Sequence, residues 1–284
     1  MSLRVVAIIQ GRMSSSRLPG KILADLAGQP MLSRVFIRTS RAATVTETVF
    51  ATTTDSSDDP VVEYCNFSGI PFTRGSLYDV LDRYYQTSKA FQADVVVRIT
   101  ADCPVIDPVL IDDCVNTLLD GSFDFTCNRL PPPFSRTYPI GLDTEVSTFA
   151  ALERAWKEST ETFHREHVMP YLYEGVELTT QHATSRSIPL RLSTGVSPRG
   201  FRIALLNHAT DFGEYRWTVD TPEDLEFIRQ VYARFEGRDD FLWKEVLDLV
   251  HNEPDLMKIN ASVQHKTLKD VDTRALKKNR DMSL

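Results

Sequence analysis

Short β-rich runs alternate with helical patterns through the first half of this 284-residue chain, and that order constrains the fold more than any other feature. The runs are Val5–Ile9, Thr48–Ala51, Val95–Ile99 and Phe123–Cys127. Strands that alternate with helices are typical of a parallel sheet with helical crossovers. We therefore predict an α/β protein of one large domain, or one domain and a smaller lobe, with a mostly parallel sheet covered by helices.

Apolar residues at helical spacing predict the covering helices. Met31, Leu32, Val35 and Phe36 share one face, and another helix begins at Asp107-Pro108. Ser76 is the predicted N-cap of a third helix, with Asp79 three residues later. In the second half we predict a helix near Phe149–Glu158, strands at Phe201–Leu205 and Tyr215–Val219, and a final strong helix that begins at Thr221-Pro222-Glu223-Asp224.

The segment that follows the first strand carries three cations, Arg12, Arg17 and Lys21, among small polar residues. Backbone N–H groups of Gly11 and the serines can face phosphate oxygens while the cations neutralise them, so the segment predicts a polyanion site. A solvated loop with incidental charges is the alternative. The segment lacks the Walker spacing, and the absence of G-x-G-x-x-G makes a dinucleotide site an unlikely use of it.

Two aspartates follow predicted strands, where chemistry occurs in open α/β sheets. Asp102 follows the run that contains Val95–Ile99, and Asp220 follows Tyr215–Val219. Mg²⁺ on a triphosphate needs one or two carboxylates, so the pair predicts a magnesium site. Asp220 as an additional helix cap, and Asp102 as a turn residue before proline, are the alternatives.

The remaining composition excludes several classes. The formal net charge of −7 argues against a general nucleic-acid binder, and no apolar segment is long enough to span a bilayer. The four cysteines show no C-x-x-C pair and are expected to be reduced thiols of a cytoplasmic protein. His164 and His167 are three apart on a predicted helix, which favours substrate contact or surface placement over a transition-metal site. No G-x-S-x-G hydrolase signature is present.

The organisation of the second half is less regular. Residues 128–139 contain three consecutive prolines and predict a long loop over the sheet, a candidate lid or subunit contact. We predict a catalytic domain over residues 1–254, with a lid or dimerisation insertion around 128–175. Residues 255–284 are polar and are expected to form a tail or a small appended element.

Three segments resemble the nucleotide-sugar cytidylyltransferases, which activate 3-deoxy-manno-octulosonate and sialic acid as CMP-sugars. They are Gly11–Lys21, Arg98–Pro104 and Val219–Glu226, and a fourth, Arg74–Tyr85, is similar to the SpsF-like branch of spore-coat polysaccharide biosynthesis in particular. The resemblance covers roughly residues 4–236 of the chain. Gln10-Gly11 and Ala101–Pro104 depart from the octulosonate enzymes but fit the SpsF-like branch.

The resemblance implies a GT-A-like nucleotide-diphospho-sugar transferase fold with a seven-stranded mixed sheet, and a homodimer. It implies that Arg12, Arg17 and Lys21 bind the phosphates of CTP and that Asp102 and Asp220 bind Mg²⁺. Residues near the nucleotide would include Gln10, Gly11, Thr52, Arg74 and Ser76, the last three close to base and ribose.

The predicted reaction is cytidylyl transfer from CTP to a sugar or sugar-like acid, with release of pyrophosphate, for surface polysaccharide or glycoconjugate synthesis. Arg12, Lys21, Asp102 and Asp220 would be catalytic, and contacts to the acceptor are predicted from later segments: Asp143, Glu145, Arg165 and His167. A GT-A glycosyltransferase is the first alternative. Such an enzyme usually needs a D-x-D motif at the end of a strand, whereas the only D-x-D sequence of this chain, Asp270-Val-Asp272, lies in the polar tail. A non-catalytic nucleotide-binding protein is the second.

Overall fold

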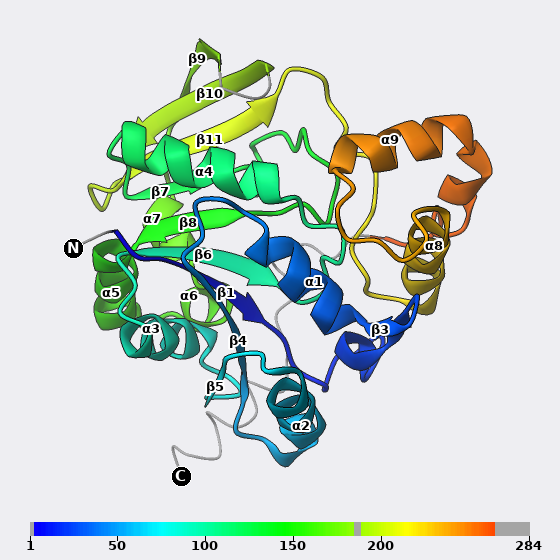
Figure 1. The fold of residues 1–284 in the computed structure, drawn as a ribbon. Coiled ribbons are helices and arrows are strands. Elements are labelled where there is room, and N and C mark those ends of the chain that lie inside the picture. The colour runs from blue at the N-terminus through cyan, green and yellow to red at the C-terminus, as the bar shows by residue number, and fades with distance from the viewer. Residues whose placement is uncertain (1–2, 185–188, 265–284) are drawn as a thin grey trace.

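One sheet organises the computed structural model, which describes residues 3–184 and 189–264 (Figure 1). Within those residues the sheet has nine strands, two more than the resemblance implied. Their spatial order is β5 (Phe72–Gly75), β4 (Glu47–Thr53), β1 (Val5–Gln10), β6 (Val95–Thr100), β8 (Glu145–Thr148), β7 (Phe125–Cys127), β11 (Arg202–His208), β10 (Pro189–Val196) and β9 (Thr179–Thr184).

The four strands β5, β4, β1 and β6 are all parallel. Gln10, the last residue of β1, pairs with Ala51 of β4 and with Thr100, the last residue of β6. The carboxyl ends of these strands therefore lie at one edge of the sheet. β8 pairs antiparallel with both β6 and β7, which makes the sheet mixed but mostly parallel in its first half, as predicted.

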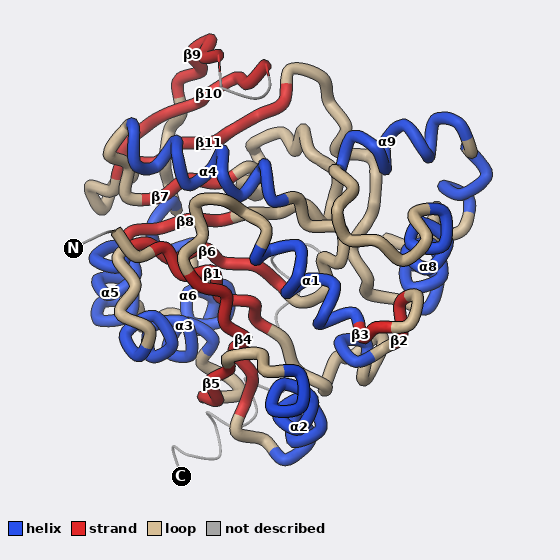
Figure 2. The backbone as a smooth tube through the Cα atoms, in the orientation of Figure 1, coloured by secondary structure: helices blue, strands red, loops and turns tan. Residues whose placement is uncertain are grey.

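Helices cover both faces of the sheet (Figure 2). Alternate strand residues enter two separate apolar cores, so that Ala7 and Ile9 face one core while Val6 and Ile8 face the other. The first core is closed by α1 (Met31–Ser40), α4 (Pro108–Asp120), α8 (Pro222–Arg234) and α9 (Trp243–Asn252), with α2 (Asp59–Ser68) at its end; the second is closed by α3 (Val80–Ala90), α5 (Phe149–Glu158) and α7 (Pro170–Tyr173), and α6 (Thr162–His167) packs on α3.

Two helix predictions need correction. The N-cap of α3 is Asp79 and not Ser76: the Asp79 carboxylate accepts from Asp82 N at 2.9 Å, while the Ser76 hydroxyl accepts from Asp79 N at 3.0 Å. The helix at Thr221 is also not the last one, because α9 follows it. Leu242 precedes α9 and has no side-chain oxygen that could accept a capping bond, while Glu245 accepts from Leu242 N at 2.7 Å.

The predicted strand Tyr215–Val219 is an extended segment outside the sheet. Its only bridge joins Arg216 to Ile140, within the residues that the structure describes. Trp217 N donates to Ile140 O at 2.7 Å, whereas Val219 N donates to Asp102 O at 2.8 Å. The segment changes its backbone partner within three residues, so no ladder forms, but Val219 and Asp220 are held beside Asp102.

The described part of the C-terminal segment packs on the domain. Its turn η3 (Pro254–Lys258) buries Leu256, and the side chain of Asn260 is also buried. Asp270 and Asp272 lie outside the described residues. The boundary at 254, and the role of 128–175 as a lid or dimer contact, stay predictions. None of the described helices has the length and apolarity that crossing a bilayer requires.

Candidate active site

The loop after β1 approaches the sheet so closely that its first residue must be glycine. A Cβ on Gly11 would lie 2.7 Å from Ala101 Cβ and 2.9 Å from the ring of Phe50. Gly11 N also donates to Ala51 O at 3.3 Å. The small size of Gly11 therefore lets the cationic loop begin directly against the carboxyl ends of β4 and β6.

A buried carboxylate holds this loop in place. Asp58, which is fully buried, accepts from Met13 N at 2.7 Å through Oδ1. Its Oδ2 accepts from the hydroxyl of Thr52 at 2.8 Å and from the backbone N–H and hydroxyl of Thr53. Asp58 was missed by sequence reasoning, since a short Asp-rich stretch before α2 reads as ordinary helix capping. Its position in fact connects the cationic loop to the end of β4.

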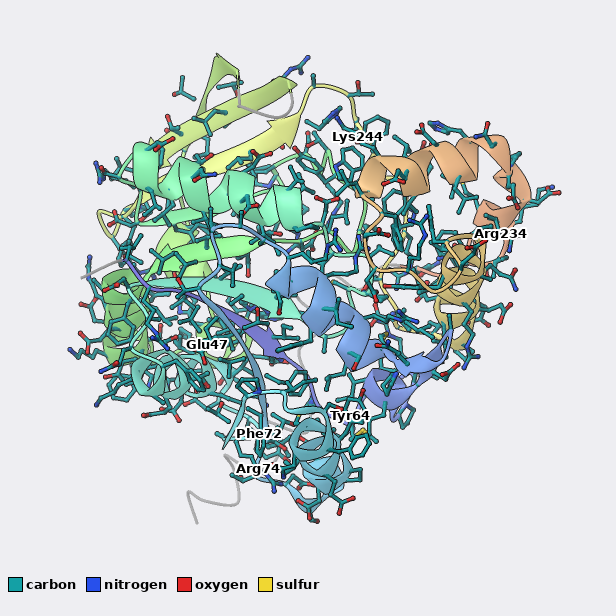
Figure 3. The ribbon with its side chains drawn as sticks, viewed as in Figure 1. Glu47, Tyr64, Phe72, Arg74, Arg234 and Lys244 are labelled. Carbon is teal, nitrogen blue, oxygen red and sulfur yellow. The ribbon has the colours of Figure 1, made fainter. Side chains whose placement is uncertain are left out.

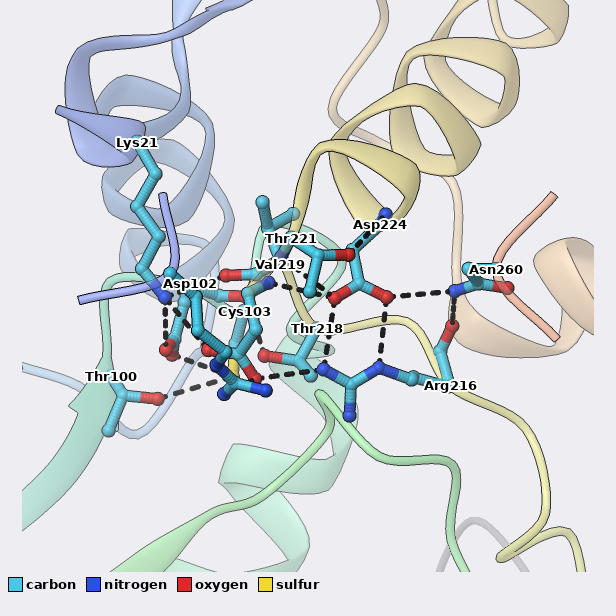
Figure 4. Close-up of polar contacts among 12 residues, drawn as sticks. Lys21, Thr100, Asp102, Cys103, Arg216, Thr218, Val219, Thr221, Asp224 and Asn260 are labelled. Carbon is cyan, nitrogen blue, oxygen red and sulfur yellow. Dashed lines mark hydrogen bonds and ion pairs between the residues drawn. The ribbon is translucent and has the colours of Figure 1, made fainter. Parts of the chain in front are cut away.

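Lys21 lies between the two predicted metal ligands. Its Nζ is 2.9 Å from Asp102 Oδ2, 3.0 Å from Asp220 Oδ1 and 2.7 Å from Val219 O (Figure 4). Thr218 Oγ1 also donates to Asp102 O at 3.0 Å, which joins the two carboxylate-bearing segments. Residues 118 positions apart in the sequence therefore meet around one ammonium group.

The charges of this cluster stabilise one another. Burial alone would lower the pKa of Lys21, but the two carboxylates outweigh it and raise the pKa above the usual lysine value. Burial would likewise raise the pKa of Asp220, but Lys21 and Arg17 lower it to about 2. Arg17 contacts Asp220 Oδ2 at 2.7 Å. Asp220 is consequently a carboxylate anion at neutral pH.

A second layer orients Asp220, and sequence reasoning did not identify it. Arg216 Nη2 donates to Asp220 Oδ2 at 2.8 Å, and the same guanidinium makes two bonds of 2.9 Å to Asp224. Asp224 accepts in addition from the N–H of Asp220 and of Thr221. Thr221 caps α8 as predicted, so Asp220 is not needed as a cap.

Asn260, in the C-terminal segment, contacts both Arg216 and Asp224. Its Nδ2 donates to Asp224 Oδ1 at 3.1 Å and to Arg216 O at 3.0 Å. Figure 4 shows the resulting row of side chains, from Lys21 at one end to Asn260 at the other. All three residues of the row behind Asp220 (Arg216, Asp224 and Asn260) are buried.

The residues predicted near base and ribose lie at the ends of β4 and β5. Thr52 is fully buried, and its hydroxyl donates to Asp58. Arg74 donates to Thr53 O at 2.7 Å and pairs with Asp59 at 2.8 Å, which places it close to α2 in Figure 3. Ser76 accepts from the start of α3. These contacts hold the three residues at the ends of β4 and β5.

The four predicted acceptor residues are divided between two places. Asp143 pairs with Arg136, and Glu145 on β8 lies 2.5 Å from its register partner Arg98 on β6. Arg165, on α6, holds the carboxylate of Asp79 and donates to Trp156 O at 2.8 Å.

His167 ends the same helix, and its ring lies 4.9 Å from that of Phe163. The structure places Arg165 against Asp79 at the N-terminal end of α3, and Glu145 beside β6.

The residues around Lys21 suit a hard divalent cation bound together with a phosphorylated ligand. The described residues contain no group of three or more His, Cys, Asp or Glu that could hold a metal. Mg²⁺ uses one or two carboxylates when phosphate oxygens and water complete its shell. A mostly parallel sheet with a cationic loop and paired aspartates at its carboxyl edge defines a nucleotidyltransferase-like α/β protein.

The family model described as Cytidylyltransferase matches residues 6–252. The chain therefore belongs to the cytidylyltransferase family, and the resemblance seen in the sequence is confirmed.

Individual relatives agree with this assignment. The spore coat polysaccharide biosynthesis protein SpsF of Bacillus subtilis is 28% identical, over 88% of this chain and 95% of that protein. A 3-deoxy-manno-octulosonate cytidylyltransferase of Geobacter metallireducens is 26% identical, over 82% of this chain and all of that protein. The solved structure of a cytidylyltransferase from Leptospira borgpetersenii matches with a TM-score of 0.78 and 27% identity, over 93% of this chain and 100% of that one.

Proposed function

We propose that this protein transfers a cytidylyl group from CTP to a sugar acid. A hydroxyl oxygen of the acceptor attacks the α-phosphorus, the bond from the α-phosphorus to the bridging oxygen breaks, and pyrophosphate leaves while the hydroxyl proton passes to solvent. The observation that carries the proposal is the contact of Lys21 with both Asp102 and Asp220 at the carboxyl edge of the sheet.

Asp102 and Asp220 are the proposed ligands of Mg²⁺. The choice rests on their donor atoms, because hard carboxylate oxygens suit Mg²⁺, and on the low pKa that keeps Asp220 ionised. When bound, the ion would neutralise charge that develops on the phosphate oxygens. Arg216 and Asp224 would keep the Asp220 carboxylate in the required orientation.

The cations of the first loop are proposed to bind the phosphates. Lys21 is paired with both carboxylates, and a bound triphosphate would offer its ammonium a second set of oxygens. Arg12 and Lys21 would stabilise the departing pyrophosphate, whose negative charge increases as the bond breaks, and Arg17 would bind the phosphates beside them. Gln10 and Gly11 would line the start of this site, and Thr52, Arg74 and Ser76 would lie toward base and ribose.

The acceptor is proposed to be a sugar acid held by Asp143, Glu145, Arg165 and His167. Arg165 and His167 would suit its carboxylate, and Asp143 and Glu145 its hydroxyls. We also propose a homodimer, and a cytoplasmic protein of surface polysaccharide or glycoconjugate synthesis. The four cysteines, which are free and buried, are compatible with a reducing compartment.

The proposed function is tested by incubating the protein with CTP, Mg²⁺ and a panel of sugar acids while pyrophosphate is assayed. The proposal predicts pyrophosphate release that requires both the metal and one acceptor. Release of a nucleoside mono- or diphosphate from a nucleotide sugar would instead indicate a glycosyltransferase. Binding of CTP without turnover across the panel would indicate a non-catalytic nucleotide-binding protein.

A further inference from the structure

Arg83, on the first turn of α3, is a buried cation with two side-chain nitrogens that lack hydrogen-bond partners among the described residues. The residue is 1% exposed, and its Nε and Nη1 are buried with no partner among the residues that the structure describes. A guanidinium is always charged at neutral pH and carries five N–H donors. Burying such a group without acceptors is strongly unfavourable, so its presence calls for an explanation.

Two other buried arginines, Arg34 and Arg38, are fully engaged. Arg34 donates to the carbonyls of Leu26, Ala27 and Gly237 and pairs with Asp239. Arg38 donates to Ile106 O at 2.9 Å, to Phe241 O at 2.9 Å and to Asp239 O at 3.1 Å. Both residues stabilise the fold by joining distant segments. Arg83 makes no such connection, which indicates a role other than structural.

The position of Arg83 is at the carboxyl edge of the sheet. A Cβ on Gly75, the last residue of β5, would lie 3.1 Å from Arg83 Cγ, so the arginine stem packs directly over the end of that strand. Asp58 and Asp79 are the carboxylates whose charges raise the pKa of Arg83, while the charge of Arg12 lowers it.

Both of those carboxylates are engaged elsewhere. Asp58 accepts from Met13, Thr52 and Thr53, and Asp79 from Arg165 and the start of α3. Burial lowers the pKa of Arg83 to about 10, which still leaves a cation at neutral pH.

The distance across the sheet indicates which part of CTP reaches Arg83. β5 and β6 are separated by three strand-to-strand steps, about 14 Å at the usual spacing. If the α-phosphate lies at Asp102 and Asp220, beyond the end of β6, the nucleoside can extend along the edge toward β4 and β5. The base, rather than the phosphates, would then lie against the end of β5.

We propose that the guanidinium of Arg83 donates hydrogen bonds to N3 and O2 of cytosine, and that this contact selects CTP over UTP. The inference rests on the proposed function. In cytosine these adjacent atoms are both acceptors, which matches the planar fork of donors. In uracil N3 carries a hydrogen, so one donor of Arg83 would meet another donor, and a buried site rejects such a mismatch.

The test compares binding of CTP and UTP by calorimetry, in the presence of Mg²⁺, for the wild type, Arg83→Met and Arg83→Lys. We expect the wild type to prefer CTP. Arg83→Met should weaken CTP binding roughly tenfold or more while changing UTP binding far less. Arg83→Lys keeps the charge without the fork, so its preference for CTP should also collapse. If Arg83→Met does not fold, the Arg83→Lys variant still tests whether Arg83 selects CTP.

Thermal unfolding of the free protein supplies the structural control. Arg83→Met should melt at or above the wild-type temperature, because it removes an uncompensated buried charge. Arg38→Met should melt lower, because several carbonyls lose their donor. An Arg83→Met variant as unstable as Arg38→Met would overturn the inference.

The binding outcomes separate this inference from the proposed function. Equal loss of CTP and UTP affinity in Arg83→Met would assign the residue to the phosphates and contradict base selection. Unchanged CTP affinity and preference would also contradict it, with the proposed function intact. A wild type that binds neither nucleotide would refute the proposed function, and the inference with it.

Discussion

At the scale of single residues, the ammonium of Lys21 determines how the two aspartates can be used. It holds Asp102 and Asp220 within 3.0 Å of one atom, although carboxylates brought so close would otherwise repel each other. The same contact means that a metal ion and Lys21 compete for the same oxygens. We infer that nucleotide phosphates are needed to draw the ammonium away.

Removal of Lys21 should therefore strengthen metal binding in the absence of nucleotide. For Lys21→Met we expect Mn²⁺ to bind roughly tenfold more tightly than to the wild type, measured by electron paramagnetic resonance without CTP, because the carboxylates lose their internal counter-ion. Turnover with CTP should fall at the same time. Lys258→Met removes the lysine of an exposed ion pair with Asp255, and this matched control should bind Mn²⁺ as the wild type does. Equal Mn²⁺ affinity in all three proteins would contradict the competition.

Replacement of either aspartate by asparagine should slow the reaction without abolishing the fold. In Asp102→Asn and Asp220→Asn we expect kcat to fall roughly a hundredfold or more, about 3 kcal/mol of barrier, as when a key charge stabiliser is lost. Pyrophosphate release measures this. Asp240→Asn, whose side chain is half exposed, is the control and should behave as wild type. Near-normal turnover in both active-site variants would refute their assignment.

At the scale of elements, the site depends on segments that meet from distant parts of the chain. The loop after β1 supplies cations, the turn after β6 supplies Asp102, and the segment before α8 supplies Asp220. Behind them, η3 and the residues after it bring Asn260 against Asp224. The C-terminal segment is thus part of the support for the site, as well as part of the core through Leu256.

Loss of the Asn260 side chain should affect both stability and turnover. Asn260→Ala leaves Asp224 Oδ1 and Arg216 O with one partner fewer, so the free energy of unfolding should fall by about 1–2 kcal/mol, measured in urea. Because Arg216 and Asp224 orient Asp220, kcat should fall too while binding of CTP changes little. Asn252→Ala, at the exposed end of α9, should do neither. A destabilised variant with full kcat would limit Asn260 to a structural role.

At the scale of the whole molecule, the sequence predicted what depends on local pattern. The strands β1, β4, β6 and β7, the α8 cap at Thr221 and the position of Asp102 directly after a strand were all readable, because each has neighbours in sequence that explain it. Tyr215–Val219 was misread since its apolar alternation resembles a strand, while its backbone pairs with two separate segments.

Contacts between distant residues could not be predicted in this way. Asp58 contacts Met13, 45 positions away, and Asn260 contacts Arg216, 44 positions away. Neither pair has a spacing that any local period produces. Arg83 reads as an ordinary helical arginine, and only its burial without partners distinguishes it. The hairpin of β9 and β10 extended the sheet beyond the seven strands implied by the resemblance.

The most direct test of the central claim is a crystal structure with CTP and Mn²⁺, with the metal located by its anomalous scattering. We expect one metal bound by carboxylate oxygens of both Asp102 and Asp220 and by the α-phosphate, with the Lys21 ammonium moved onto phosphate oxygens. A metal bound away from either aspartate, or CTP bound with Lys21 still bridging the two carboxylates, would contradict it.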